Sequence, residues 1–144
     1  MNEGRLRFVV DASVGIKLFV AEPLSDRTDA LISKLGKEPP AELYVPDLFY
    51  IECANILLKY ARRFGRSVED AQADLVDLNL LALKSIPTVD LMEDAFSQAA
   101  QRNLSAYGAR YAVLAQRLEI PLITADEPMA KAVEWAIRLE DFKP

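Results

Sequence analysis

The segment Phe8-Val9-Val10-Asp11-Ala12-Ser13 decides the fold class of this 144-residue chain. Its apolar run ends at an aspartate, which is typical of a buried strand in a parallel sheet. A second run of this kind, Pro121-Leu122-Ile123-Thr124, ends close to Asp126. Because short apolar runs alternate with helical segments along the chain, we expect an α/β fold, a three-layer α/β/α sandwich with a mainly parallel central sheet.

The remaining elements follow from turn and capping residues. Ser67 with Asp70 resembles a capping box that begins a helix, and Gly36 and Gly65 favour helix ends. The expected strands are 8–10, 43–45, 121–124 and an edge strand at 136–139, with 85–89 as a strand or an extended connection. The expected helices cover 13–19, 23–36, 46–64, 68–83, 90–103, 105–118 and 128–135.

Composition narrows the classes of function. The chain is 51% hydrophobic and 27% charged, and we expect a single domain over residues 1–144. The chain has no histidine, which excludes histidine-based catalysis and histidine-ligated zinc. Its single cysteine, Cys53, excludes an intramolecular disulfide. No apolar stretch is long enough to cross a bilayer and no signal-peptide pattern is present, so we expect a cytoplasmic protein without a membrane partner. The net charge of -5 argues against attraction of the whole surface to nucleic acid.

Carboxylates must therefore carry any chemistry. Asp11 and Asp126 each follow a predicted parallel strand, and ligands bind outside the carboxyl ends of such strands. Glu52 lies at the border of the buried face of a predicted helix, where Asn55 shares that face. Close carboxylates repel each other, and Mg²⁺ or Mn²⁺ makes their ionised forms favourable. Each acid also has an ordinary explanation, since Asp11 and Asp126 can cap helices and Glu52 can face water.

Four motifs, in this order and spacing, resemble those of PIN domains. They are 8–13 with 17–19, then Pro46 through Glu52-x-x-Asn55-x-Leu57, then Ser105-Ala106-Tyr107, and last Pro121 to Asp126. The resemblance extends to 137–142 and is closest to VapC-type toxins of toxin–antitoxin pairs. It implies a Mg²⁺- or Mn²⁺-dependent ribonuclease with Asp11, Glu52 and Asp126 as catalytic acids and metal ligands. Ser13 and Thr124 match positions that support such a site, and a cognate antitoxin and a homodimer are implied as partners.

The chain departs from this family at Gly108. The third acid of the family stands in a Ser-x-Tyr-Asp-Ala motif, whereas residues 105–109 read Ser-Ala-Tyr-Gly-Ala. In the first turn of a helix an aspartate is favourable, and glycine costs about 1 kcal/mol relative to alanine. Relaxed selection, deliberate inactivation, or a backbone or water ligand in place of the carboxylate each account for the glycine. We expect residual metal binding and much reduced cleavage of RNA.

Other functions stay open beside the ribonuclease. One is a catalytically decayed PIN module that binds RNA or protein. Another is a receiver-like signalling domain, because phosphoacceptor aspartates also stand at strand ends. Glu52 on a helix, and no lysine after a late strand, argue against the receiver-like domain.

A basic cluster lies at the end of the helix that carries Glu52. It comprises Lys59, Arg62, Arg63 and Arg66. These side chains either contact RNA phosphates or complement the negative end of the helix dipole.

Arg110 follows Gly108 by two residues and either pairs with Glu52 or Asp126 or points into solvent. We expect an exposed Arg110, and Tyr107 and Tyr111 that pack against neighbours. Leucines 75, 78 and 81, with Val76 and Leu80, predict a packed helix or a dimer surface.

Overall fold

The computed structural model describes residues 6–18, 25–37 and 40–142. Its sheet has five strands in the order β3-β2-β1-β4-β5, and every neighbouring pair is parallel. The strands are β1 (Arg7–Val10), β2 (Glu42–Pro46), β3 (Lys84–Ile86), β4 (Leu122–Thr124) and β5 (Ala136–Arg138). β1 is the central strand, and its neighbours β2 and β4 follow it in the chain on opposite sides. Ligands of open parallel sheets bind where the strand order reverses in this way.

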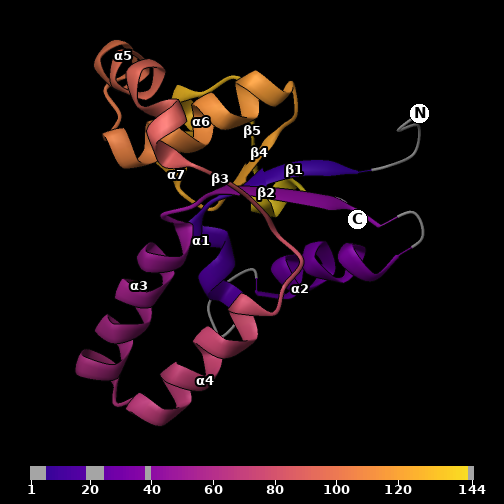
Figure 1. Cartoon of the computed structure of the whole chain (residues 1–144), viewed down its shortest axis with the longest axis vertical. Coiled ribbons are helices and arrows are strands. Elements are labelled where there is room, and N and C mark those ends of the chain that lie inside the picture. Colours follow the sequence, from indigo (N-terminus) through magenta and orange to yellow (C-terminus); the bar gives the residue numbers. More distant parts are fainter. Residues whose placement is uncertain (1–5, 19–24, 38–39, 143–144) are drawn as a thin grey trace.

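Helices cover both faces of the sheet, which confirms the expected three-layer α/β/α sandwich (Figure 1). The helices on one face are α1 (Ala12–Gly15), α2 (Ser25–Ser33), α3 (Phe49–Phe64) and α4 (Val68–Asn79). Those on the other face are α5 (Met92–Arg102), α6 (Ala106–Leu118) and α7 (Glu127–Ala132). Short 3-10 segments are η1 (Ile16–Leu18), η2 (Lys34–Gly36), η3 (Thr88–Leu91) and η4 (Leu139–Asp141).

The central layer is held by apolar burial. Val9 of β1 and Leu122 and Ile123 of β4 are fully buried, as a strand with helices on both faces must be. α6 is buried at every position from 109 to 115, because small residues such as Ala109 and Ala112 let it lie close to the sheet. Burial of this apolar surface stabilises the fold by roughly 25 cal/mol for each Å² removed from water.

Most predicted elements are confirmed, and the differences lie at their ends. The helix expected over 46–64 begins at Phe49, because Pro46 is the last residue of β2 and pairs with Ile86. Its end is confirmed, since Gly65 adopts a φ of 74°, a left-handed conformation that favours glycine. The first helix is capped by Asp11, not by Ser13.

Further boundaries shift by a few residues. The helix expected over 68–83 ends at Asn79, and the one expected over 90–103 begins at Met92 after η3. The segment at 128–135 is helical only over α7, and the segment at 23–36 is divided into α2 and η2. Of the helix ends predicted from sequence, Phe19 and Pro23 lie outside the described residues.

α3 and α4 form an antiparallel pair that extends away from the sheet (Figure 1). A small apolar cluster of Ile16, Leu57 and Ala71 holds the pair against η1. Leu78 of α4 is fully buried, which confirms a packed helix, while Val76 and Leu80 are 59% and 78% exposed. Among the described residues, no helix combines the length and the apolar character needed to cross a bilayer.

Candidate active site

Asp11 lies directly after β1 and is only 5% exposed. Its Oδ1 atom accepts hydrogen bonds from the Val14 N–H at 3.3 Å and the Ser13 hydroxyl at 2.5 Å. Its Oδ2 atom accepts one from the Thr124 hydroxyl at 2.5 Å. Burial raises the pKa of Asp11, these hydrogen bonds lower it, and the negative charge of Asp126 raises it further. Asp11 therefore does cap α1, but it is also a buried acid beside a second acid.

Two hydroxyl groups join the ends of β1 and β4 around Asp11. Besides donating to Asp11, the Ser13 hydroxyl accepts a hydrogen bond from the Ala125 N–H at 3.0 Å. The Thr124 hydroxyl likewise accepts one from the Asp126 N–H at 3.0 Å. The Asp11 carboxylate is therefore fixed in orientation relative to the chain that carries Asp126.

Asp126 is exposed and follows β4 by two residues. It stands at the N-cap position of α7, but its side chain makes no capping hydrogen bond. The carboxylate is close enough to Asp11 to act on its pKa. The structure thus brings two of the three predicted acids together at the carboxyl ends of adjacent strands.

Glu52, in the first turn of α3, contacts α6 instead. Its Oε1 atom accepts hydrogen bonds from the Arg110 guanidinium and from the Tyr111 hydroxyl, the latter at 2.9 Å. The Glu52 side chain is 23% exposed, whereas that of Arg110 is 2% exposed. Asn55 is exposed on α3, and the hydrogen bonds that reach Glu52 come from α6.

The expectation of an exposed Arg110 is wrong, and the alternative of a pair with Glu52 is what the structure shows. Arg110 lies in the part of α6 that is buried at every position. Its guanidinium carbon is 4.8 Å from the ring centre of Tyr111 and 5.5 Å from that of Tyr107. Its Nε and Nη1 atoms are buried and have no hydrogen-bond partner among the described residues. Burial lowers the pKa of Arg110, while Tyr111 and Asp47 raise it.

Gly108 occupies the third position of α6, where its N–H donates to the Ser105 hydroxyl oxygen at 3.1 Å. A Cβ atom at this position would lie 2.7 Å from the Cε atom of Met129. Met129 belongs to α7 and is 3% exposed. The methyl group of Met129 therefore fills the space beside Gly108 into which a longer side chain would extend.

The donor set fits a divalent cation only in part. Within residues 6–18, 25–37 and 40–142, no three Asp, Glu, His or Cys side chains lie close enough together to hold a metal ion. Asp11 and Asp126 suit a hard cation, because it would relieve their repulsion and offset the burial of Asp11. Glu52 is already neutralised by Arg110. The fully buried Cys53 is no substitute, since burial raises the pKa of its thiol to about 12.

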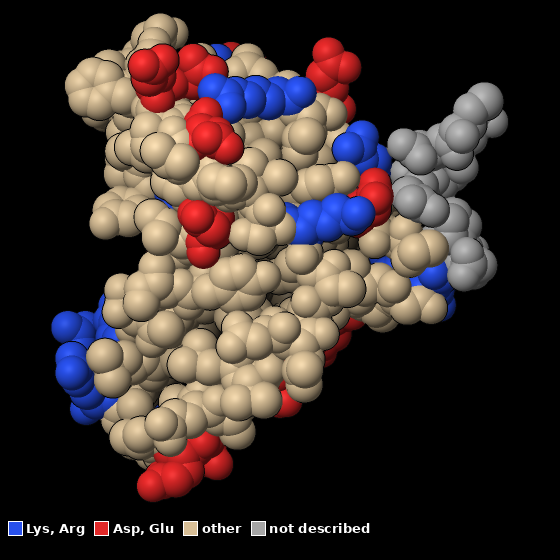
Figure 2. All heavy atoms as spheres, viewed as in Figure 1, with Lys and Arg blue, Asp and Glu red and all other residues tan. Residues whose placement is uncertain are grey.

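A groove of about 450 Å³ connects this site with α3. Ser13 and Ala125 line it beside Asp11, and Lys17, Lys59 and Arg63 supply positive charge along it. Figure 2 shows a cluster of basic side chains at the lower left, on the outer side of the α3–α4 arm, the antiparallel helix pair that extends away from the sheet.

The predicted basic cluster is divided by the structure. Lys59 and Arg63 line the groove, whereas Arg62, exposed on the last turn of α3, does not line it. Arg66 instead forms an ion pair with Asp74 of α4, to which its Nε atom donates a hydrogen bond at 2.9 Å. Arg66 is therefore tied to the α3–α4 arm.

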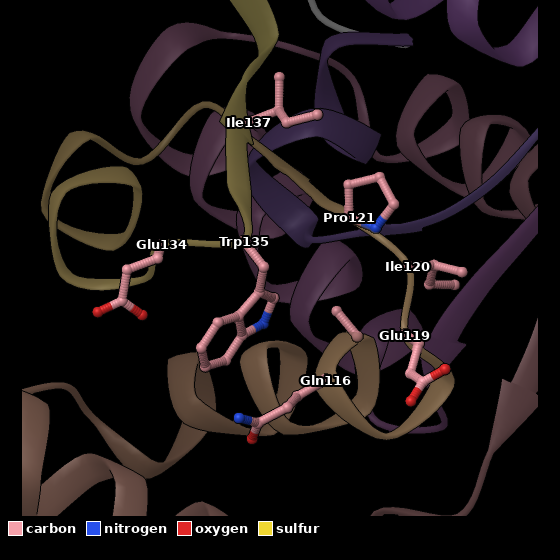
Figure 3. Close-up of a pocket in the computed structure, with 8 residues that line it drawn as sticks. Gln116, Glu119, Ile120, Pro121, Glu134, Trp135 and Ile137 are labelled. Atoms are coloured by element: carbon pink, nitrogen blue, oxygen red, sulfur yellow. The ribbon is translucent and has the colours of Figure 1, made fainter.

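A second cavity, of about 500 Å³, lies away from the acids. Trp135 and Pro121 form its apolar wall, and Glu119 and Glu134 lie on either side of it (Figure 3). These residues precede β4 and β5, so the cavity opens at the amino ends of the strands. It is therefore separate from the site around Asp11.

Sequence reasoning missed Tyr111 as a partner of Glu52 and placed Arg110 in solvent. The signal for Arg110 was a lone cation inside the run from Ala109 to Ala115, in which every other residue is small, apolar or aromatic. A charged residue in such a run is rarely buried unless it has a partner of opposite charge. The partner, Glu52, is 58 residues away; the sequence offered it as one of two candidate acids, but no local pattern favoured the pair over an exposed arginine.

Comparison with known proteins identifies the family of this chain. The family model described as the PIN domain matches residues 8–134. Ribonuclease VapC3 of Pyrobaculum aerophilum is 32% identical over 129 residues, which cover 88% of this chain and 94% of that protein.

Solved structures share the same architecture. PAE2754 from Pyrobaculum aerophilum has a TM-score of 0.70 at 28% identity, with 94% of this chain and 92% of that chain covered. VapC20 of Mycobacterium tuberculosis, a sarcin–ricin loop cleaving toxin, shows the same fold with a TM-score of 0.64 at 17% identity. The match covers 87% of this chain and 94% of that chain. The family match spans most of the chain and includes all three acids at the strand ends and on α3. The chain belongs to the PIN domain family.

Proposed function

We propose that this chain is a toxin-type endoribonuclease that uses Mg²⁺ or Mn²⁺, with an activity weakened at Gly108. The observation that supports it most is the buried Asp11 carboxylate, oriented by Ser13 and Thr124 and repelled by Asp126. A fold that buries one acid beside another gives up stability, and such arrangements cluster at functional sites. The name of ribonuclease VapC3, a relative over most of the chain, supports RNA as the substrate.

The residues of this chain would divide the work. Asp11 and Asp126 would hold the divalent ion, and Ser13 and Thr124 would keep the Asp11 carboxylate in its orientation. A divalent ion in such a site lowers the pKa of bound water and stabilises negative charge on a phosphate. Glu52 is held at the edge of the site by its hydrogen bonds from α6.

The groove beside the acids is the path we propose for the RNA. Lys59 and Arg63 line it, and Arg62 precedes Arg63 in the last turn of α3. Positively charged side chains bind the phosphates of the RNA backbone, and this binding does not depend on the base sequence. The net charge of -5 is that of the whole molecule, and it is compatible with a groove whose local positive charge attracts RNA. A cognate antitoxin that covers the same groove is the protein partner we propose.

A second candidate is the catalytically decayed module. The pair between Glu52 and Arg110 favours it, because a guanidinium already neutralises one of the three acids. Under this alternative the groove still binds RNA or an antitoxin, but no phosphodiester is cleaved.

Cleavage of single-stranded RNA with Mn²⁺ separates the two candidates. The ribonuclease predicts slow cleavage by the unmodified chain, loss of cleavage in Asp11→Asn and on chelation of the metal, and faster cleavage in Gly108→Asp. RNA binding without cleavage, by both the unmodified chain and Gly108→Asp, would establish the decayed module instead. Equal cleavage by Asp11→Asn would point to a contaminating nuclease and would reject the proposal.

A further inference from the structure

The acidic site contains a cation of its own. Arg110 is the most voluminous fully buried side chain of the described residues, and its guanidinium donates to the Oε1 atom of Glu52. Glu52 lies near Asp11, because Tyr111, whose hydroxyl donates to Glu52, is close enough to Asp11 for the charge of that acid to act on its pKa. Arg110 therefore places a positive charge beside these acids. A divalent cation therefore meets a site that is partly neutralised before it arrives.

The guanidinium has few other ways to be satisfied. Its Nε and Nη1 atoms find no hydrogen-bond acceptor among the described residues, so Glu52 is the acceptor that compensates its burial. The exposed Asp47 carboxylate acts on Arg110 through its charge, and its Oδ1 atom accepts a hydrogen bond from the Thr88 N–H at 2.9 Å. A buried charge of this kind is costly to leave unpaired, so Arg110 holds Glu52 firmly.

Met129 is a second feature that limits the negative charge of the site. Met129 fills the space beside Gly108, where the resemblance to PIN domains places a third acid. The Met129 methyl group thus occupies space where a further carboxylate would add negative charge. In addition, the Arg110 guanidinium forms an ion pair with Glu52. Both features lower the attraction of the site for a divalent cation.

We propose that Arg110 competes with the divalent cation for Glu52, so that Glu52 becomes a metal ligand only when the ion pair between Glu52 and Arg110 opens. The inference rests on the proposed function, because it concerns the metal that this function uses. In the closed pair, Asp11 and Asp126 bind the cation alone and weakly. Arg110 is a positioning residue in this scheme, since it acts through Glu52 and touches neither metal nor RNA.

The test compares Mn²⁺ affinity, measured by isothermal titration calorimetry, in matched variants. Arg110→Leu removes the competing cation, and we expect its Mn²⁺ affinity to rise about 10-fold or more, the scale of effects seen for residues that orient metal ligands. Arg117→Leu is the control, because Arg117 lies on the same helix but forms an exposed pair with Asp94 at 2.7 Å. We expect its affinity to equal that of the unmodified chain. Adding Glu52→Gln to Arg110→Leu should abolish the gain.

Three results would overturn the proposal: an affinity of Arg110→Leu within twofold of the unmodified chain, an equal gain in Arg117→Leu, or a gain that survives Glu52→Gln. Circular dichroism checks that each variant folds, and Arg110→Gln, which keeps a polar side chain, takes the place of Arg110→Leu if the latter unfolds. Cleavage of RNA is measured separately. Tighter Mn²⁺ binding without cleavage would support the competition and reject the ribonuclease.

Discussion

Replacing Glu52 by leucine should destabilise the fold far more than its partly exposed position suggests. The substitution leaves the Arg110 guanidinium buried without its carboxylate partner, and leaves the Tyr111 hydroxyl without its acceptor. Breaking a buried ion pair in this way costs about 3–5 kcal/mol. Because Glu52 is 23% exposed, some water can reach the guanidinium, and we take the lower end, about 3 kcal/mol. For 144 residues this lowers the melting temperature by roughly 6–12 °C.

A double-mutant cycle isolates the pair from other effects of the substitution. Arg110→Leu alone leaves a Glu52 that water can hydrate, and should cost about 1–2 kcal/mol. The double variant Glu52→Leu/Arg110→Leu should cost little more than Arg110→Leu, so that the coupling free energy is at least about 2 kcal/mol. Urea unfolding with an unchanged m-value gives these differences.

The exposed pair between Asp94 and Arg117 provides the control cycle. Its side chains are 62% and 43% exposed, and we expect a coupling of about 0.5 kcal/mol or less. If the coupling of Glu52 with Arg110 is no larger than this, the buried pair does not exist in solution. The inference on metal competition would then lose its basis.

Three further predictions follow from the same site. Asp11→Asn should stabilise the fold by about 0.5–2 kcal/mol at neutral pH, since burial raises the pKa of Asp11 and penalises its ionised form. That advantage should shrink as the pH falls toward the ordinary aspartate value of 3.8, where Asp11 is protonated as well, and thermal unfolding across pH would show it. Gly108→Asp/Met129→Ala should cleave RNA faster than Gly108→Asp, because a Cβ atom at position 108 would lie 2.7 Å from the Met129 Cε atom, which the second substitution removes; equal rates would contradict the steric argument. Replacing both Arg62 and Arg63 by serine should reduce the salt slope of RNA binding by about 1.4, and an unchanged slope would exclude phosphate contacts there.

The parallel sheet and the end positions of the acids could be predicted from local patterns. The continuous apolar runs that end at Asp11 and near Asp126 predict buried strands. Parallel strands bring their carboxyl ends to one edge of the sheet. The capping pair of Ser67 and Asp70 and the left-handed Gly65 likewise depend on a few neighbouring residues. Local chemistry therefore sufficed for most helix and strand positions.

The interior of the site could not be predicted in the same way. The Glu52–Arg110 pair, which the sequence offered only as an alternative, depends on how α3 and α6 meet, and the position of the Met129 methyl group beside Gly108 depends on how α7 lies beside α6. Helix propensity gave no reason for glycine at position 108, and the structure adds only that a Cβ atom there would lie 2.7 Å from the Cε atom of Met129, so the flexible end of that side chain would have to move.

The location of bound Mn²⁺, determined by anomalous diffraction from crystals of the unmodified chain, tests the central claim most directly. The account predicts one anomalous peak at the carboxyl ends of β1 and β4, within coordination distance of Asp11 and Asp126. A chain that binds no Mn²⁺ at these two carboxylates, or holds the ion only elsewhere, would contradict it.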